Sequence, residues 1–134
     1  MSLFVDTSVW SLALRRDAPP ESAEVKALAH ALENGEPILT TGLVLQELLQ
    51  GFSGPKDRKA ILDRFAALPL LVPDRQDHVD AAALRNDCRR RGVQVGTIDA
   101  LLARICLRHN LAMLTTDQDF HRVARISGLK LRTA

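Results

Sequence analysis

The stretch Leu3-Phe4-Val5-Asp6-Thr7-Ser8-Val9-Trp10 decides the fold that we predict for this chain. Its apolar half predicts a short buried strand at about residues 2–6. The return of apolar residues at helical spacing predicts a helix from about residue 8, capped by Thr7 or Ser8. The strand would end at a carboxylate. Open sheets with helices on both faces bind ligands beyond the carboxyl ends of their strands, so Asp6 is the first candidate site residue.

The rest of the chain repeats this alternation of short apolar runs and helical patterns. Further strands are expected near 37–40, 70–72, 111–114 and 129–131, and further helices near 21–33, 43–50, 56–68, 75–91, 98–109 and 119–126. Short apolar strands separated by helices indicate a parallel sheet that is buried on both faces. We therefore predict an α/β fold, a small three-layer α/β/α sandwich with a mostly parallel central sheet, in which residues 1–134 form one domain.

Local patterns predict three details of these helices. Thr40 or Thr41 should open the helix near 43–50, and Thr97 should cap the helix that begins at Ile98. In the charged helix near 75–91, the inward residues should be Val79, Ala82 and Ala83.

Composition limits the compartment and the class of partner. Hydrophobic residues make up 46% of the chain, but no apolar run reaches the ~18 residues of a membrane span. The first residues carry no basic segment of the signal-peptide type, so we expect a cytoplasmic protein in which Cys88 and Cys106 are free thiols. The net charge of +2 does not by itself indicate a polyanion partner, although most of the 18 basic residues are arginine, which suits phosphate contacts.

Four carboxylates occupy positions that apolar patterning does not explain. Asp6 and Asp117 follow predicted strands, Glu47 shares a helix face with Leu43 and Val44, and Asp99 lies in the first turn of a helix. Each acid has a structural explanation: Asp6 could accept backbone hydrogen bonds, Asp99 could favour the helix dipole and Asp117 could cap the last helix. Glu47 is the hardest to explain in this way, because a carboxylate on an apolar face needs a partner or a raised pKa.

Taken together, the four acids favour a metal site. Carboxylates that meet without a cation repel one another, whereas Mg²⁺ or Mn²⁺ takes oxygen ligands and typically handles phosphates. No His/Cys cluster has zinc spacing, and neither a P-loop nor a GxGxxG or GxSxG motif is present. The histidines are expected at the surface, with His121 kept open because it lies four residues after Asp117.

Four motifs in order carry a resemblance to a known family. They are Val5-Asp6-Thr7-Ser8, Leu45-Gln46-Glu47-Leu48, Thr97-Ile98-Asp99-Ala100-Leu101-Leu102-Ala103 and Leu114-Thr115-Thr116-Asp117-Gln118-Asp119-Phe120. Over essentially the whole chain this pattern resembles the PIN-domain nucleases, and more narrowly the VapC toxins of bacterial toxin–antitoxin pairs. The chain departs from many relatives at Thr116, where they carry Asn or Arg.

The resemblance implies an endoribonuclease that depends on Mg²⁺ or Mn²⁺. Asp6, Glu47, Asp99 and Asp117 correspond to the acidic quartet of the family, with Asp6 and Asp99 the firmest metal ligands. Thr7 or Ser8, and Thr115, would be hydroxyls that orient carboxylates, and Asp119 a cap with a minor metal role. The expected reaction is in-line attack of a metal-bound water on an RNA phosphodiester, which leaves 5′-phosphate and 3′-hydroxyl ends.

The resemblance also implies partners. The expected substrate is transfer, ribosomal or messenger RNA, and a small antitoxin is expected to block the acidic site of a homodimer. Trp10 and Phe52 are candidates for that interface and equally for the core. Basic residues that could steer RNA toward the acids are Arg15, Arg16, Lys56, Arg58, Lys59 and Arg89-Arg90-Arg91.

Two other classes of function remain open from the residues alone. One is a phosphatase that uses Asp6 as a covalent nucleophile, although Ser8 stands where such an enzyme needs a second acid. The other is a Mg²⁺-binding module without catalytic activity.

Overall fold

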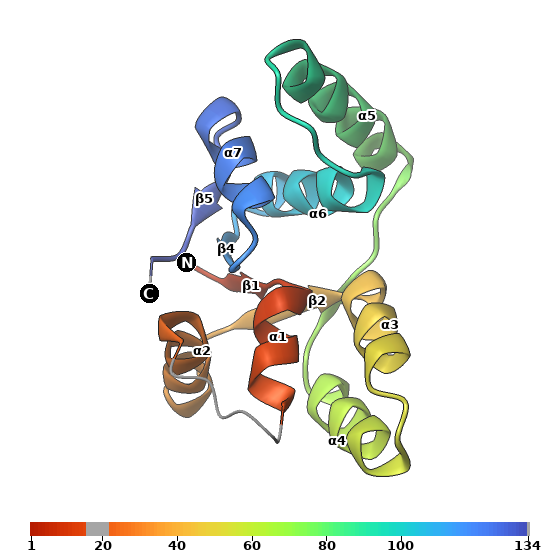
Figure 1. Ribbon diagram of the computed structural model, residues 1–134, viewed down its shortest axis with the longest axis vertical. Coiled ribbons are helices and arrows are strands. Elements are labelled where there is room, and N and C mark those ends of the chain that lie inside the picture. The colour runs from red at the N-terminus through yellow and green to blue at the C-terminus, as the bar shows by residue number, and fades with distance from the viewer. Residues whose placement is uncertain (16–21, 134) are drawn as a thin grey trace.

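The computed structural model describes residues 1–15 and 22–133 as alternating strands and helices (Figure 1). The strands are β1 (Leu3–Val5), β2 (Ile38–Thr41), β3 (Leu70–Leu71), β4 (Ala112–Leu114) and β5 (Lys130–Leu131). The helices are α1 (Thr7–Leu14), α2 (Ala23–Glu33), α3 (Gly42–Gly51), α4 (Pro55–Ala66), α5 (Arg75–Arg90), α6 (Thr97–Arg108) and α7 (Gln118–Ile126). Every strand and helix predicted from the sequence is present, with bounds that differ by one or two residues.

The five strands form one sheet in the order β3-β2-β1-β4-β5, and all four pairings are parallel. Leu3 of β1 is in register with Ile38 of β2 on one side and with Ala112 of β4 on the other. The chain therefore progresses outward from β1 in both directions, and the strand order reverses between β1 and β4. Folds of this kind bind ligands beyond the carboxyl ends of the strands at such a switch point.

Helices cover both faces of the sheet, as the three-layer prediction requires. In Figure 1, α1 to α4 lie on one side of the strands and α5, α6 and α7 lie on the other. Phe4 and Val5 of β1 are buried completely, because apolar neighbours cover this central strand on both faces. Cys88 and Cys106 are free and buried, as expected, and no helix among the described residues is long and apolar enough to cross a bilayer.

Trp10 belongs mainly to the core. It is buried, and its ring lies 5.1 Å from that of Phe65, at an interplanar angle of 53°. Phe52, at the end of α3, is half-buried against the same core. Trp10 also lines a groove described below, so an interface role stays a prediction.

The predicted N-caps are correct in one helix and wrong in two. Thr41 caps α3, and its hydroxyl accepts a hydrogen bond from the Val44 amide. Helix α1, however, begins at Thr7 with Asp6 as N-cap, and α6 begins at Thr97 with Gly96 as N-cap. Both helices start one residue earlier than expected, because the backbone of Asp6 and of Gly96 is extended and the following residue is already helical.

The inward face of α5 also differs from the prediction. Val79 is 56% exposed, Ala82 and Ala83 are exposed, and the inward residues are Asp77, Ala81 and Cys88. This register is stabilised by a polar pair rather than by apolar spacing, because Arg108 Nη1 of α6 lies 2.5 Å from Asp77 Oδ2. Burial alone would raise the pKa of Asp77, but hydrogen bonds from Arg108 and from the backbone of Asp74 lower it below the ordinary value.

Candidate metal centre

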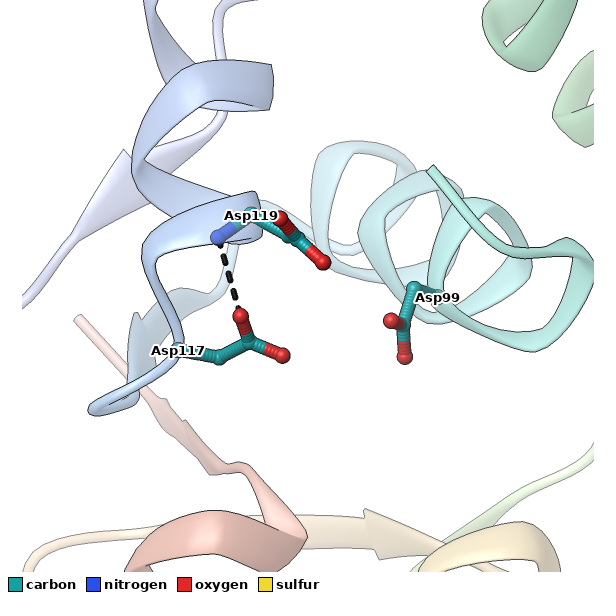
Figure 2. A group of neighbouring side chains, drawn as sticks. All are labelled: Asp99, Asp117 and Asp119. Carbon is teal, nitrogen blue, oxygen red and sulfur yellow. Dashed lines mark hydrogen bonds between the residues drawn. The ribbon is translucent and has the colours of Figure 1, made fainter. Parts of the chain in front are cut away.

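Three carboxylates converge beside the carboxyl end of β4 (Figure 2). One oxygen from each of Asp99, Asp117 and Asp119 lies within 4.8 Å of the others. Asp99 comes from the first turn of α6, whereas Asp117 and Asp119 come from the start of α7. Residues that are far apart in the sequence thus place three acidic groups in one space.

Asp117 both caps α7 and faces the candidate metal centre. It is the N-cap of α7, and its Oδ1 accepts a hydrogen bond of 2.9 Å from the Asp119 amide. Its second oxygen points toward the space that Asp99 faces (Figure 2). The capping and the site interpretations of Asp117 are therefore compatible, because a carboxylate has two acceptor oxygens.

Asp6 is held at the end of β1 by hydroxyl groups. Only 6% of this residue is exposed, and its Oδ2 accepts hydrogen bonds of 2.8 Å from both Ser8 Oγ and Thr115 Oγ1. Ser8 Oγ also accepts from the Thr116 amide, and Thr115 Oγ1 accepts from the Asp117 amide. The two hydroxyls predicted to orient carboxylates thus connect the ends of β1 and β4 and fix the carboxylate of Asp6.

Electrostatic interactions extend the cluster beyond the three acids in Figure 2. The pKa of Asp99 rises from 3.8 to about 6 because burial disfavours its charge and because Asp6, Asp117, Glu47 and Asp119 repel it. Asp6, Glu47, Asp117 and Asp119 are therefore all close enough to Asp99 to act on its charge. Carboxylates this close to one another repel, and a bound cation would reduce that repulsion.

Comparisons with known proteins place the chain in a family. Residues 3–126 match the model of the PIN domain. The chain belongs to the PIN-domain family. This match confirms the resemblance found in the sequence motifs, and it covers the complete span from β1 to the end of α7.

Named relatives and solved structures agree with this assignment to the PIN family. The chain is 29% identical over 130 residues to Ribonuclease VapC11 of Mycobacterium tuberculosis, with 96% of each chain covered, and 28% identical over 116 residues to Ribonuclease VapC23 of the same species, with 85% and 90% covered. Its fold matches that of VapBC2 from Rickettsia felis bound to a promoter DNA fragment (TM-score 0.75, 23% identity, 98% of each chain). It also matches that of FitAcB from Neisseria gonorrhoeae (TM-score 0.68, 20% identity, 98% and 96% covered).

The donor set of this PIN domain fits a hard divalent cation. The described side chains that converge here offer carboxylate and hydroxyl oxygens, which are the ligands that Mg²⁺ and Mn²⁺ prefer. A ring nitrogen of His121 lies 3.1 Å from the Asp117 carbonyl oxygen, so that nitrogen is engaged by the backbone. The negative charge around Asp99 also favours a cation, because a bound cation would reduce the repulsion among the carboxylates.

Glu47 differs from the sequence expectation for this PIN domain. The buried face of α3 carries Val44 and Leu48, whereas Glu47 is exposed at the rim of that face, so its predicted position within an apolar stripe is wrong. Its pKa is nevertheless raised by partial desolvation and by the charge of Asp6, an effect that the nearby Thr7 hydroxyl opposes. Thr7 Oγ1 is buried and forms no hydrogen bond of standard geometry with any described residue.

Basic residues predicted to steer RNA have different locations in the PIN fold. Lys56, Arg58 and Lys59 lie on α4, on the opposite side of the sheet from α6 and α7, and Lys59 pairs with Asp63 (Figure 1). Arg15 is exposed after α1, and Arg16 lies outside the described residues. The described basic side chains that line a hollow beside Asp119 are Arg85 and Arg89, of which the sequence analysis identified only Arg89.

Proposed function

We propose that this PIN domain, with residues 1–134 as one unit, is a metal-dependent endoribonuclease that acts in the cytoplasm as the toxin of a toxin–antitoxin pair. The observation that carries the proposal is the convergence of Asp99, Asp117 and Asp119 on one space, near enough to Asp6 and Glu47 for their charges to act on Asp99. Similarity over nearly the full chain to proteins named Ribonuclease VapC supports the choice of RNA as substrate.

Each acid has a proposed role that follows from its surroundings. Asp6 is the best oriented, because two hydroxyl donors hold one of its oxygens. Asp99 and Asp117, together with Asp119, contribute oxygens from the opposite wall, and we assign a larger role to Asp119 than the sequence suggested because it completes the closest group. Glu47 lies at the rim of the site, where its exposure favours contact with the cation through a water molecule.

A divalent cation bound here, Mg²⁺ or Mn²⁺, would supply a water of lowered pKa and would neutralise negative charge on the phosphate under attack. The chain itself orients the carboxylates through Ser8 and Thr115 and keeps their charges together. No side chain need form a covalent bond to phosphate. Asp6 is poorly suited to be a nucleophile, because two hydrogen bonds to Oδ2 stabilise its carboxylate.

RNA cleavage by the purified chain tests the proposal directly. We expect total cellular RNA to be cut at discrete sites when Mg²⁺ or Mn²⁺ is present and to stay intact in EDTA. Asp6→Asn and Asp99→Asn should abolish cleavage while preserving the fold, whereas Glu33→Gln, which changes an exposed acid at the end of α2, should not. Full activity of either site variant in Mg²⁺ would refute the proposal, as would a phosphoaspartate trapped at Asp6.

The antitoxin has a suitable docking groove on the face opposite α5. A cavity of about 370 Å³ is lined by residues of α1, α2 and α4, namely Trp10, Ala13, Leu14, Val25, Leu28, Ala29, Leu32, Ala60 and Arg64. Co-purification with the product of a small adjacent reading frame, and its loss in Ala29→Glu, which changes an exposed residue of the groove, but not in Val79→Glu, would support this assignment.

A second copy of the chain fits a different surface. Leu70, Val72 and Ile98 are exposed at 48%, 81% and 45%, and the first two line an apolar cavity of about 440 Å³ with Leu43 and Leu101. We place the homodimer contact here, because exposed aliphatic side chains around an apolar hollow are typical of an interface. Val72→Asp should convert the dimer to a monomer in light scattering, whereas a dimer that persists would contradict this placement.

A further inference from the structure

A second hollow lies next to the acidic cluster and has the opposite charge along one wall. It encloses about 440 Å³, and the side chains that line it include Arg85, Arg89, Gln94 and Asp119. Asp119 is also one of the three acids that form the closest group of the candidate metal centre. The hollow therefore adjoins the site where RNA would be cut, and its two arginines come from α5.

The two arginines share one face of α5, since they are four residues apart. Arg85 Nε donates a hydrogen bond of 2.9 Å to the Val95 carbonyl oxygen, which fixes the base of its guanidinium at the wall of the hollow. Arg89 is exposed and donates a weaker hydrogen bond of 3.3 Å to Asn86 on the same helix. No acid among the described residues is paired with either arginine, so both guanidinium groups retain donors for an anion.

The neighbouring arginines of the same run have different partners. Arg90 and Arg91 both approach Asp87 Oδ1, at 3.5 and 3.8 Å. Arg90 lines a different hollow, with Arg104 and Gly128, which none of the three converging acids lines. Arg89 is thus the only member of the Arg89–Arg91 run among the residues lining the hollow beside Asp119. Arg89 is therefore placed for a local phosphate contact, whereas Arg90 and Arg91 could act on RNA only through general electrostatic attraction.

We infer that the hollow formed by Arg85, Arg89 and Gln94 binds a backbone phosphate of the RNA strand next to the phosphate that is cut. This inference rests on the proposed function. Asp119 lines the same hollow as the two guanidinium groups, so a strand whose scissile phosphate lies at the acids would bring a neighbouring phosphate to the arginines. Arg85 and Arg89 would be positioning residues that set where along the strand the cut occurs.

A paired substitution tests the inference. Arg89→Gln and the matched control Arg90→Gln are each made in the wild-type chain and in the Asp99→Asn variant, which should leave RNA intact. Binding of a labelled single-stranded oligouridine to the Asp99→Asn forms is measured by fluorescence anisotropy over a salt series. Cleavage of the same oligonucleotide by the other forms is measured in Mg²⁺.

We expect Arg89→Gln to weaken binding by about tenfold and to reduce the slope of log affinity against log salt by about 0.7, the value for one phosphate contact on a single strand. Its KM should rise more than its kcat falls. Arg90→Gln should change neither quantity by more than about twofold. Equal effects of the two substitutions, or no effect of Arg89→Gln while the wild type cleaves RNA, would overturn the inference alone. A wild type that cleaves neither this oligonucleotide nor total cellular RNA in Mg²⁺ would overturn the proposed function and this inference with it.

Discussion

Replacing Asp99 by Asn should stabilise the metal-free protein and remove its response to Mg²⁺. The pKa of Asp99 rises from 3.8 to about 6 in the folded chain, so its ionised form is less favourable there than in the unfolded chain. A difference of about two units corresponds to about 3 kcal/mol as an upper bound, and solvent screening of a partly exposed group reduces this to about 1–2 kcal/mol. Asn has nearly the same shape and no charge, so at neutral pH it should recover that free energy of unfolding.

The sign of the pH dependence follows from the raised pKa. Stability due to this carboxyl is fully present below its unfolded pKa of 3.8 and is lost as the pH rises through about 6. The advantage of Asp99→Asn over the wild type in EDTA should therefore be greatest above pH 6 and should disappear near pH 4. For a domain of this size, 1–2 kcal/mol corresponds to a rise in Tm of about 3–8 °C.

Thermal unfolding followed by circular dichroism measures both effects. In the wild type, Mg²⁺ at a hundredfold excess over its Kd should add about 2.7 kcal/mol to the free energy of unfolding and so raise Tm. Asp99→Asn should show little of this rise, and Glu33→Gln should behave as the wild type. The reasoning is refuted if Asp99→Asn is less stable than the wild type in EDTA at neutral pH, or if Mg²⁺ raises its Tm equally.

Three further predictions follow from the same contacts. The affinity of the wild type for Mn²⁺ should fall by about tenfold per pH unit below about 6, because a proton competes for Asp99; calorimetry that finds constant affinity down to about pH 5 would contradict this. Thr115→Val removes a donor to Asp6 and should weaken metal binding by about 10- to 100-fold, whereas Thr116→Val, which keeps the amide that donates to Ser8 Oγ, should not. Arg108→Gln leaves Asp77 buried without its cation and should lower Tm clearly, while Arg90→Gln, from an exposed pair, should not; equal Tm values would show that the buried pair is unimportant.

The sequence alone determined the architecture, because the signals for it are local. An apolar run that ends at Asp6, and another that ends just before Thr115, identify buried strands without knowledge of their neighbours. Parallel strands bring their carboxyl ends to one edge, so acids that follow two such strands were expected to meet there. Thr41 was predicted correctly as a cap, since the hydrogen bond from its hydroxyl spans only three residues.

Only the tertiary structure decided how helices are rotated about their axes and which acids are closest. The buried pair of Asp77 and Arg108 turns α5 away from the face that Val79 suggested, and periodicity carries no signal for a contact across 31 residues. The same uncertainty of rotation explains why Glu47 is at the rim rather than within the apolar face of α3. Asp119 joins Asp99 because α6 and α7 begin side by side, which depends on packing over the sheet and not on the local pattern.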